Sequence, residues 1–281
     1  MLSYRHAFHA GNHADVLKHF LLVELLDYLN RKDKPWCYID THAGAGCYTL
    51  DGEHAAKTAE HAAGIGRLWL RDDLPEALRP YVDAVRQFNA HGGLTFYPGS
   101  PALAMTRVRA QDRMHLFELH PADAALLQKT FVGEPARVAV RKADGFSALR
   151  ALLPPPSRRA LVLIDPPYEV KDDYRRTVEA LADALRRFPT GCFAVWYPML
   201  ARPEARQLPE RLAALGAESW LDVRLMVRKP PRDGLGLFGS GMFVVNPPWI
   251  LPERLEAVMP WLAAHLAEDD GAGFDLEHRI E

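Results

Sequence analysis

Short apolar runs that alternate with helical patterns are the feature that most constrains the fold of this chain. Most of the runs end in an acid, a glycine or a proline, as buried strands of a parallel sheet do. The runs are Trp36–Asp40, Met114–Glu118, Arg137–Asp144, Ala160–Asp165, Cys192–Tyr197, Ser219–Val227 and Met242–Asn246. Helical patterns separate most of them, so we predict an α/β fold with a Rossmann-like, seven-stranded, mostly parallel sheet.

Two features of the chain order refine this prediction. The last two strands lie close together around the glycine-rich residues 234–241, which predicts a hairpin at one edge of the sheet. After about Ala267 no further strand or helix pattern is visible, and we expect a frayed tail.

The interval between the first two strands is too long for a regular alternating fold. The glycine turn Asp40–Gly46 (DTHAGAG) should be followed by a ribose-binding acid about 20 residues later. The next strand-ending acid is Glu118, so about 50 residues are inserted. Residues 51–97 are charged and have a helical pattern. We therefore expect a core of residues 1–50 and 98–281 with a small helical insertion at residues 51–97.

Acids at the ends of successive strands predict a nucleoside pocket, because the carboxyl ends of parallel strands meet at one edge of a sheet. Glu118 could accept two hydrogen bonds from a ribose diol. Asp144 could accept from an adenine amino group, while Gly145 lets the ring lie close. His42 and Ser100 flank the same edge and could hold an amino-acid group. No pyrophosphate cradle follows the glycine turn, which favours S-adenosylmethionine over NAD.

The segment Asp165-Pro166-Pro167-Tyr168 carries the most specific chemistry. The Asp165 carboxylate and the Pro166 carbonyl can each accept one hydrogen of an exocyclic amino group. The prolines fix that carbonyl in space, and Tyr168 offers a face on which a flat ring could stack. Together these residues predict a catalytic site for an amine such as adenine N6. A plain Pro-Pro turn at the end of a strand is the alternative interpretation.

A second segment, Asn246-Pro247-Pro248-Trp249, has nearly the same pattern after the last predicted strand. Asp165 follows the fourth strand, which lies beside the glycine turn in a doubly wound sheet. We therefore expect Asp165 to be catalytic, and Asn246 to shape a nearby wall of the site.

Polar residues crowd the N-terminus, where sixteen residues include Tyr4, His6, His9, His13, Lys18 and His19. No carboxylate completes a metal motif such as HExxH, so we expect no metal site. A helix that begins at Asn12 or Asp15 would carry some of these groups to the cleft. There they could close over a methyl donor and contact a substrate phosphate.

The bulk composition limits the choice of partners. A net charge of -2 argues against binding nucleic acid by bulk charge, so a local patch is required. The candidate patches are the basic clusters at residues 31–34, 158–159, 175–176 and 228–232. Three cysteines without CxxC spacing fit a reducing compartment. With no apolar segment long enough to span a membrane, we expect a cytoplasmic protein.

Seven longer motifs occur along nearly the whole chain, in the order SYRHAFHAGNHADVLKH, DTHAGAG, YPGSP, FELHP, KADGF, IDPPY and GMFVVNPPW. With these motifs the chain resembles the RlmJ family of 23S ribosomal RNA adenine-N6 methyltransferases. The resemblance implies a monomeric, S-adenosylmethionine-dependent enzyme with a helical insertion in a Rossmann-like core. Its partner would be 23S ribosomal RNA, either naked or in an early assembly particle.

The resemblance also implies roles for individual residues. The cofactor or its pocket would involve His19, His42, Ser100, Glu118, Asp144, Gly145 and Asp165. Catalysis would use Asp165, Pro166 and Tyr168, with Asp165 taking up or shielding the proton that the base loses. Tyr4 would contact the RNA, and we assign His6 and Lys18 from the same segment to the substrate as well.

Other functions share parts of this pattern. A DNA adenine-N6 methyltransferase would perform the same chemistry on another nucleic acid. A protein glutamine-N5 methyltransferase also holds an amide with an Asn/Asp-Pro-Pro-Tyr motif. A ribosome-binding protein without activity and an NAD oxidoreductase are further alternatives, the last disfavoured by the missing pyrophosphate cradle. The residues do not identify the target nucleotide.

Overall fold

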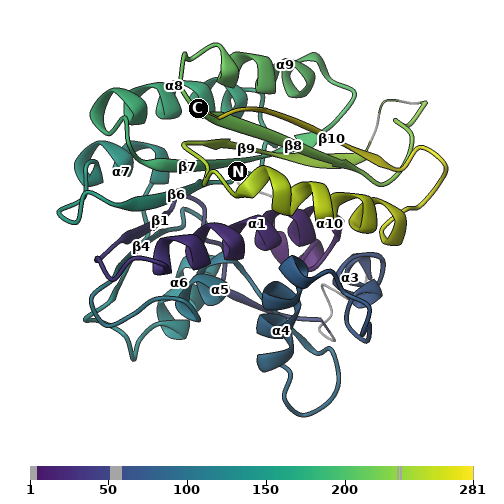
Figure 1. The fold of residues 1–281 in the computed structure, drawn as a ribbon. Coiled ribbons are helices and arrows are strands. Elements are labelled where there is room, and N and C mark those ends of the chain that lie inside the picture. Colours follow the sequence, from purple (N-terminus) through teal and green to yellow (C-terminus); the bar gives the residue numbers. More distant parts are fainter. Residues whose placement is uncertain (1–4, 51–58, 233, 235, 281) are drawn as a thin grey trace.

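The computed structural model describes residues 5–50, 59–232, 234 and 236–280, and its main feature is an eight-stranded sheet (Figure 1). The strand order is β10-β8-β9-β7-β6-β1-β4-β5. The strands are β1 Cys37–Asp40, β4 Arg113–Phe117, β5 Val138–Arg141, β6 Ala160–Ile164, β7 Cys192–Met199, β8 Trp220–Met226, β9 Gly239–Val245 and β10 Gly273–Arg279. Strands β5, β4, β1, β6 and β7 are parallel, and the pairings beyond β7 are antiparallel. The predicted Rossmann-like α/β core is confirmed.

Three expectations about the end of the chain are wrong. The sheet has eight strands and not seven, because β10 pairs with β8 where a frayed tail was expected. Strands β8 and β9 do pair with each other, but β10 pairs with the outer side of β8, so their hairpin is not at the edge. The pattern of β10 was hard to recognise because several of its residues are charged and exposed, as is common in an edge strand.

Helices cover both faces of the sheet and enclose two hydrophobic cores (Figure 1). One face carries α7 Gly145–Leu152, α8 Asp172–Arg187 and α9 Pro203–Ala213. The other carries α1 His13–Asn30, α5 Ser100–Met105, α6 Pro121–Thr130 and α10 Leu251–His265. In β6, Leu161 and Leu163 face the second group of helices, and Val162 and Ile164 face the first. Because both faces are buried, the strand is apolar throughout.

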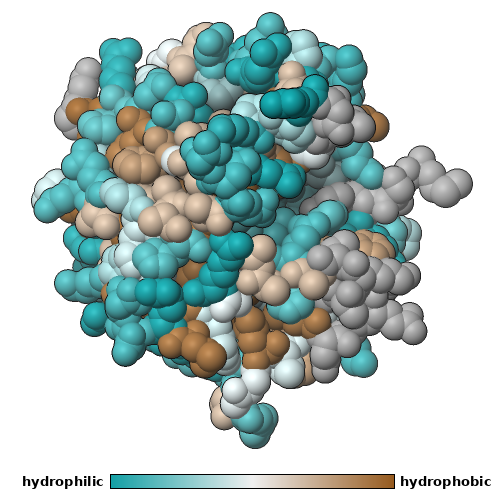
Figure 2. Space-filling model, turned by 90° about the vertical axis from the view of Figure 1, so that its right-hand side faces the viewer, coloured by the Kyte–Doolittle hydropathy of each residue, from teal (hydrophilic) through white to brown (hydrophobic). Residues whose placement is uncertain are grey.

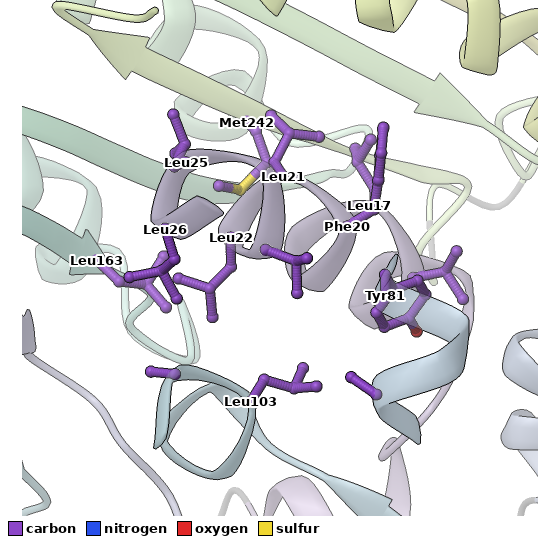
Figure 3. Close-up of a cluster of buried hydrophobic side chains, with 14 of the residues drawn as sticks. Leu17, Phe20, Leu21, Leu22, Leu25, Leu26, Tyr81, Leu103, Leu163 and Met242 are labelled. Carbon is purple, nitrogen blue, oxygen red and sulfur yellow. The ribbon is translucent and has the colours of Figure 1, made fainter. Parts of the chain in front are cut away.

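Helix α1 is enclosed on nearly all sides. All its residues from His13 to Leu26 are buried, which explains why its apolar residues follow no single stripe. Figure 3 shows its side chains between Met242 of β9 and, on the opposite side, Tyr81 and Leu103. The helix follows a short 3-10 turn, η1 His6–Phe8, and is capped by Asn12, whose side chain accepts from the backbone N–H of Ala14 and Asp15.

Between β1 and β4 the described residues form short helices and a small two-stranded sheet. Strands β2 Cys47–Thr49 and β3 Phe96–Pro98 pair antiparallel. Between them lie α3 Glu60–Ala63, η2 Ile65–Arg67, η3 Glu76–Leu78 and α4 Arg79–Gln87, while residues 51–58 are outside the described part. The pairing of Thr49 with Phe96 brings the ends of this segment together. It supports the division into a core and an insertion at residues 51–97, which stays a proposal.

Hydrophilic side chains cover most of the face in Figure 2, and hydrophobic ones form small groups among them. Among the described residues, none of the helices is both long enough and apolar enough to cross a membrane. The cytoplasmic location stays a prediction.

Candidate active site

A cavity of about 810 Å³ lies at the carboxyl ends of the parallel strands, where ligands bind in open α/β sheets. Its volume suits a ligand of nucleoside size. It is lined by all the predicted site residues that the structure describes: His6, Lys18, His19, His42, Ser100, Glu118, Asp144, Gly145, Asp165, Pro166 and Tyr168. The predicted RNA contact Tyr4 lies outside the described residues. The structure thus brings the predicted residues together, and their individual roles stay predictions.

Glu118 ties the end of β4 to the glycine turn after β1. Its carboxylate accepts hydrogen bonds from the backbone N–H of Gly44 at 2.9 Å and of His120 at 2.6 Å. Gly44 has a φ of 61°, in the left-handed region that favours glycine. Because each carboxylate oxygen accepts only one of these bonds, each retains a lone pair for a further donor such as a ribose hydroxyl.

The junction of β5 and α7 is held by Gly145 and Asp144. A Cβ atom on Gly145 would lie 2.1 Å from the carbonyl oxygen of Thr41, so a larger residue would force the backbone apart. Asp144 caps α7 by accepting from the N–H of Phe146 at 3.1 Å. Its other oxygen accepts from Arg176 of α8 at 2.5 Å. Arg176 was predicted only as part of a basic cluster, and here it orients the acid expected to bind adenine.

Asp40, the last residue of β1, lies behind the cavity wall and is fully buried. Its carboxylate accepts hydrogen bonds from the hydroxyls of Ser100 at 2.7 Å and Tyr38 at 2.8 Å, and from the N–H of His42 at 3.2 Å. Burial raises the pKa of Asp40 to about 6. Asp40 therefore positions two of the predicted cofactor contacts from behind. Its place before the glycine turn was the sequence signal.

The Asp165 carboxylate is paired with Lys18 from α1. The Nζ atom of Lys18 lies 2.6 Å from Oδ2 of Asp165 and 2.9 Å from Oδ1 of Asp15. Asp15 also lies 2.9 Å from Nε2 of His6. Burial raises the pKa of Asp165, and the Lys18 ammonium opposes this rise, which favours the ionised acid. Lys18 is largely buried but lines the cavity, and its two ion pairs leave one of its three N–H groups for the predicted contact with substrate.

Tyr168 is held in a strained conformation with little of its ring exposed. Its φ is 52°, and its ring is 2% exposed and packs against Tyr174 and Trp196. Its hydroxyl donates to the backbone carbonyl of Trp196 at 2.8 Å. Non-glycine residues in this region often mark functional sites. Stacking of a base on Tyr168 stays a prediction, and the partly exposed Trp196, which sequence reasoning missed, offers a second aromatic wall.

The second Pro-Pro segment lies at the amino ends of the parallel strands, on the side of the sheet opposite to the cavity. Strand β9 is antiparallel to β7, and Val245 pairs with Phe193 near the start of β7. The side chain of Asn246 donates to the carbonyls of Pro189 and Gly191, both at 2.7 Å. The expectation that Asn246 shapes a wall of the site is wrong, because the direction of its strand places it at the other edge.

Two of the four basic clusters lie near the amino ends of the parallel strands, and two lie near the carboxyl ends, where the cavity is. Arg159, just before β6, donates to the carbonyls of Leu29 and Lys34 and so stabilises loops at the edge away from the cavity. Arg176 and Arg228, from the other two clusters, line the cavity. Of the four clusters, only those of Arg176 and Arg228 are near a substrate that binds in the cavity.

Comparisons with known proteins agree on one family. The profile described as "Ribosomal RNA large subunit methyltransferase D, RlmJ" matches residues 33–278. The chain is 49% identical over 266 residues to the ribosomal RNA large subunit methyltransferase J of Escherichia coli (strain K12), covering 95% of this chain and 94% of that protein. It is 44% identical over 279 residues to the Haemophilus influenzae protein of the same name, covering 99% and 98% of the two chains. A crystal structure from Legionella pneumophila matches with a TM-score of 0.88 at 35% identity, covering 97% of this chain and 99% of that one.

Proposed function

Because the chain belongs to the RlmJ family of ribosomal RNA large subunit methyltransferases, we propose that it methylates N6 of one adenine in 23S ribosomal RNA. The methyl donor is S-adenosylmethionine. The observation that carries the proposal is the shared cavity. It is lined both by the ribose and adenine acceptors Glu118 and Asp144 and by the amine acceptors Asp165 and Pro166. We further propose that the protein acts as a cytoplasmic monomer on naked or early-assembly RNA.

The residues that line the cavity fit this cofactor. Glu118 keeps two lone pairs for a ribose diol, and Asp144 is a carboxylate acceptor for the adenine amino group. His19 is buried at the cavity, and its Nε2 atom has no hydrogen-bond partner among the described residues. A buried polar atom of this kind normally has a partner, which the amino-acid end of the cofactor would provide. When bound, the cofactor supplies an electrophilic methyl group on its sulfonium sulfur.

Asp165 and the Pro166 carbonyl hold the adenine amino group for attack. Accepting both N–H hydrogens orients N6 and makes its lone pair more available. Positioning at near-attack distance supplies several kcal/mol of the barrier reduction. As the new N–C bond forms, positive charge develops on N6, and the ionised Asp165 stabilises it. An aryl amine is far too weak an acid to be deprotonated by a carboxylate first, so the proton leaves after transfer, toward Asp165.

The target adenine cannot reach this cavity from within a helix, so it is flipped out or presented in a loop. Arg176 and Arg228 line the cavity, where they pair with Asp144 and Glu268, and their remaining N–H groups are the proposed contacts for flanking phosphates.

Transfer of tritiated methyl groups from S-adenosylmethionine to protein-free 23S RNA tests the proposal, with duplex DNA as a parallel acceptor. We expect labelled N6-methyladenosine from RNA, and a loss of about 100-fold or more in Asp165→Ala. Trp249→Ala is the matched control, since Trp249 follows the second Pro-Pro pair at the other edge and is 70% exposed. Label in DNA alone, or in neither nucleic acid although S-adenosylmethionine binds, would replace the proposal with the DNA or the protein methyltransferase function.

A further inference from the structure

Two buried tyrosines connect the proposed helical insertion to His19. The hydroxyl of Tyr97 lies 2.7 Å from Nδ1 of His19 and 3.0 Å from the hydroxyl of Tyr81. Tyr81 belongs to α4 and Tyr97 to β3, and both are 0% exposed. Neither tyrosine lines the cavity, whereas His19 does. The three side chains therefore form a hydrogen-bonded chain that ends at the cavity.

The number of hydroxyl hydrogens decides which group donates in each hydrogen bond between Tyr81, Tyr97 and His19. Each hydroxyl has one hydrogen, and within the described residues the hydroxyl of Tyr81 has that of Tyr97 as its hydrogen-bond partner. If Tyr81 donates to Tyr97, then Tyr97 donates to Nδ1 of His19 and both hydroxyl hydrogens are used. In the opposite direction the hydrogen of Tyr81 would be buried without an acceptor. That arrangement costs the full desolvation of the hydroxyl, so the first direction is favoured.

The direction of the chain fixes the tautomer of His19. Burial lowers the pKa of His19 to about 3, so the ring is neutral near neutral pH and has one N–H. With Nδ1 accepting from Tyr97, that hydrogen is on Nε2, the nitrogen without a partner among the described residues. A ring nitrogen that only donates cannot bind an ammonium group, but it can bind a carboxylate.

We propose that Tyr97, supported by Tyr81, is a positioning residue that fixes His19 as a hydrogen-bond donor to the carboxylate of the methyl donor. The inference rests on the proposed function, because the methyl donor provides that carboxylate. It gives the helical insertion a part in cofactor binding without any contact with the cofactor. These hydrogen bonds also explain why tyrosine and not phenylalanine occupies the fully buried positions 81 and 97.

The tautomer is measured directly by long-range nitrogen–proton NMR on the ligand-free protein labelled in its histidines, with His19→Asn to assign the signal. We expect a proton on Nε2 and none on Nδ1 in the wild type. In Tyr97→Phe we expect Nδ1 to become protonated in part, whereas Tyr81→Phe should keep the wild-type tautomer because Tyr97 can still donate. A proton on Nδ1 in the wild type would overturn the proposal.

Binding of S-adenosylhomocysteine, measured by calorimetry on the same proteins, tests the consequence. The product keeps the amino-acid end of the methyl donor, so Tyr97→Phe should weaken binding about 10-fold and Tyr81→Phe clearly less. Equal binding by Tyr97→Phe and the wild type would refute the positioning role. If the wild type shows the expected tautomer and does not bind S-adenosylhomocysteine, the proposed function fails while the assigned tautomer stands. Thermal unfolding of each variant separates a loss of folding from a loss of binding.

Discussion

Replacing Lys18 by methionine should destabilise the protein strongly, because it removes the ammonium group that pairs with two buried acids. The Lys18 side chain is 6% exposed, and its partners Asp15 and Asp165 are 1% and 14% exposed. Methionine keeps much of the apolar stem, so the main change is the loss of charge. Removing one partner of a buried ion pair typically costs about 3–5 kcal/mol, and we expect a loss in that range.

The loss should depend on pH. In the wild type, Lys18 lowers the pKa of both Asp15 and Asp165 and so opposes the effect of burial. Without it, both pKa values rise in the folded state. A carboxyl whose folded pKa is raised stabilises the fold only at low pH, and this stability is lost as pH rises through the folded pKa. The deficit of Lys18→Met should therefore be largest at about pH 8 and shrink toward about pH 5.

Urea unfolding followed by circular dichroism at both pH values measures this deficit. Lys229→Met is the matched control, since Lys229 pairs with Asp270 on the surface and the two side chains are 61% and 80% exposed. An exposed pair contributes about 1 kcal/mol or less. The reasoning is refuted if Lys18→Met loses no more stability than Lys229→Met, or if its deficit is the same at both pH values.

Two further predictions concern the strand ends around the cavity. Gly145→Ala should lose about 1–3 kcal/mol of unfolding free energy, because its Cβ would meet the Thr41 carbonyl oxygen at 2.1 Å. In the same urea experiment Gly133→Ala, whose Cβ would meet no atom within 4 Å, should change little, and equal losses would contradict the argument. Burial raises the pKa of Asp40 from 3.8 to about 6, so the stability that its neutral form contributes is lost as pH rises through this interval. Asp40→Asn cannot titrate, so its unfolding free energy should fall less than that of the wild type between pH 3.8 and about 6. If the two free energies change equally with pH in this interval, Asp40 does not titrate as a buried acid.

The parallel core and the cavity could be predicted because their signals are local. A run such as Ala160–Ile164 is apolar at every position, which indicates a strand covered by helices on both faces. The carboxyl end of such a parallel strand lies where open α/β sheets bind their ligands. This logic placed Glu118, Asp144 and Asp165 around one cavity before their contacts were known. It failed for Asn246, because a Pro-Pro motif does not reveal that its strand runs antiparallel.

Contacts between residues distant in the chain were beyond such reasoning. Lys18 and Asp165 are 147 positions apart, and His19 and Tyr97 are 78 apart. The sequence shows that α1 is apolar nearly all round and so must be enclosed. It does not show which neighbours enclose it, so it cannot show that the Lys18 ammonium faces an acid while the His19 ring faces a tyrosine.

Helix α1 links these two contacts, because consecutive residues of one turn serve the two halves of the cavity. Lys18 holds Asp165, the proposed acceptor for the substrate amine, and His19 is the proposed donor to the carboxylate of the methyl donor. The helix packs on β9 of the sheet on one side and on α4 of the proposed insertion on the other (Figure 3). A close-packed helix cannot turn without moving both neighbours. Under the proposed function, substrate and cofactor groups would therefore be held at a fixed distance by packing that involves the insertion, and this segment would contribute to catalysis without touching either ligand.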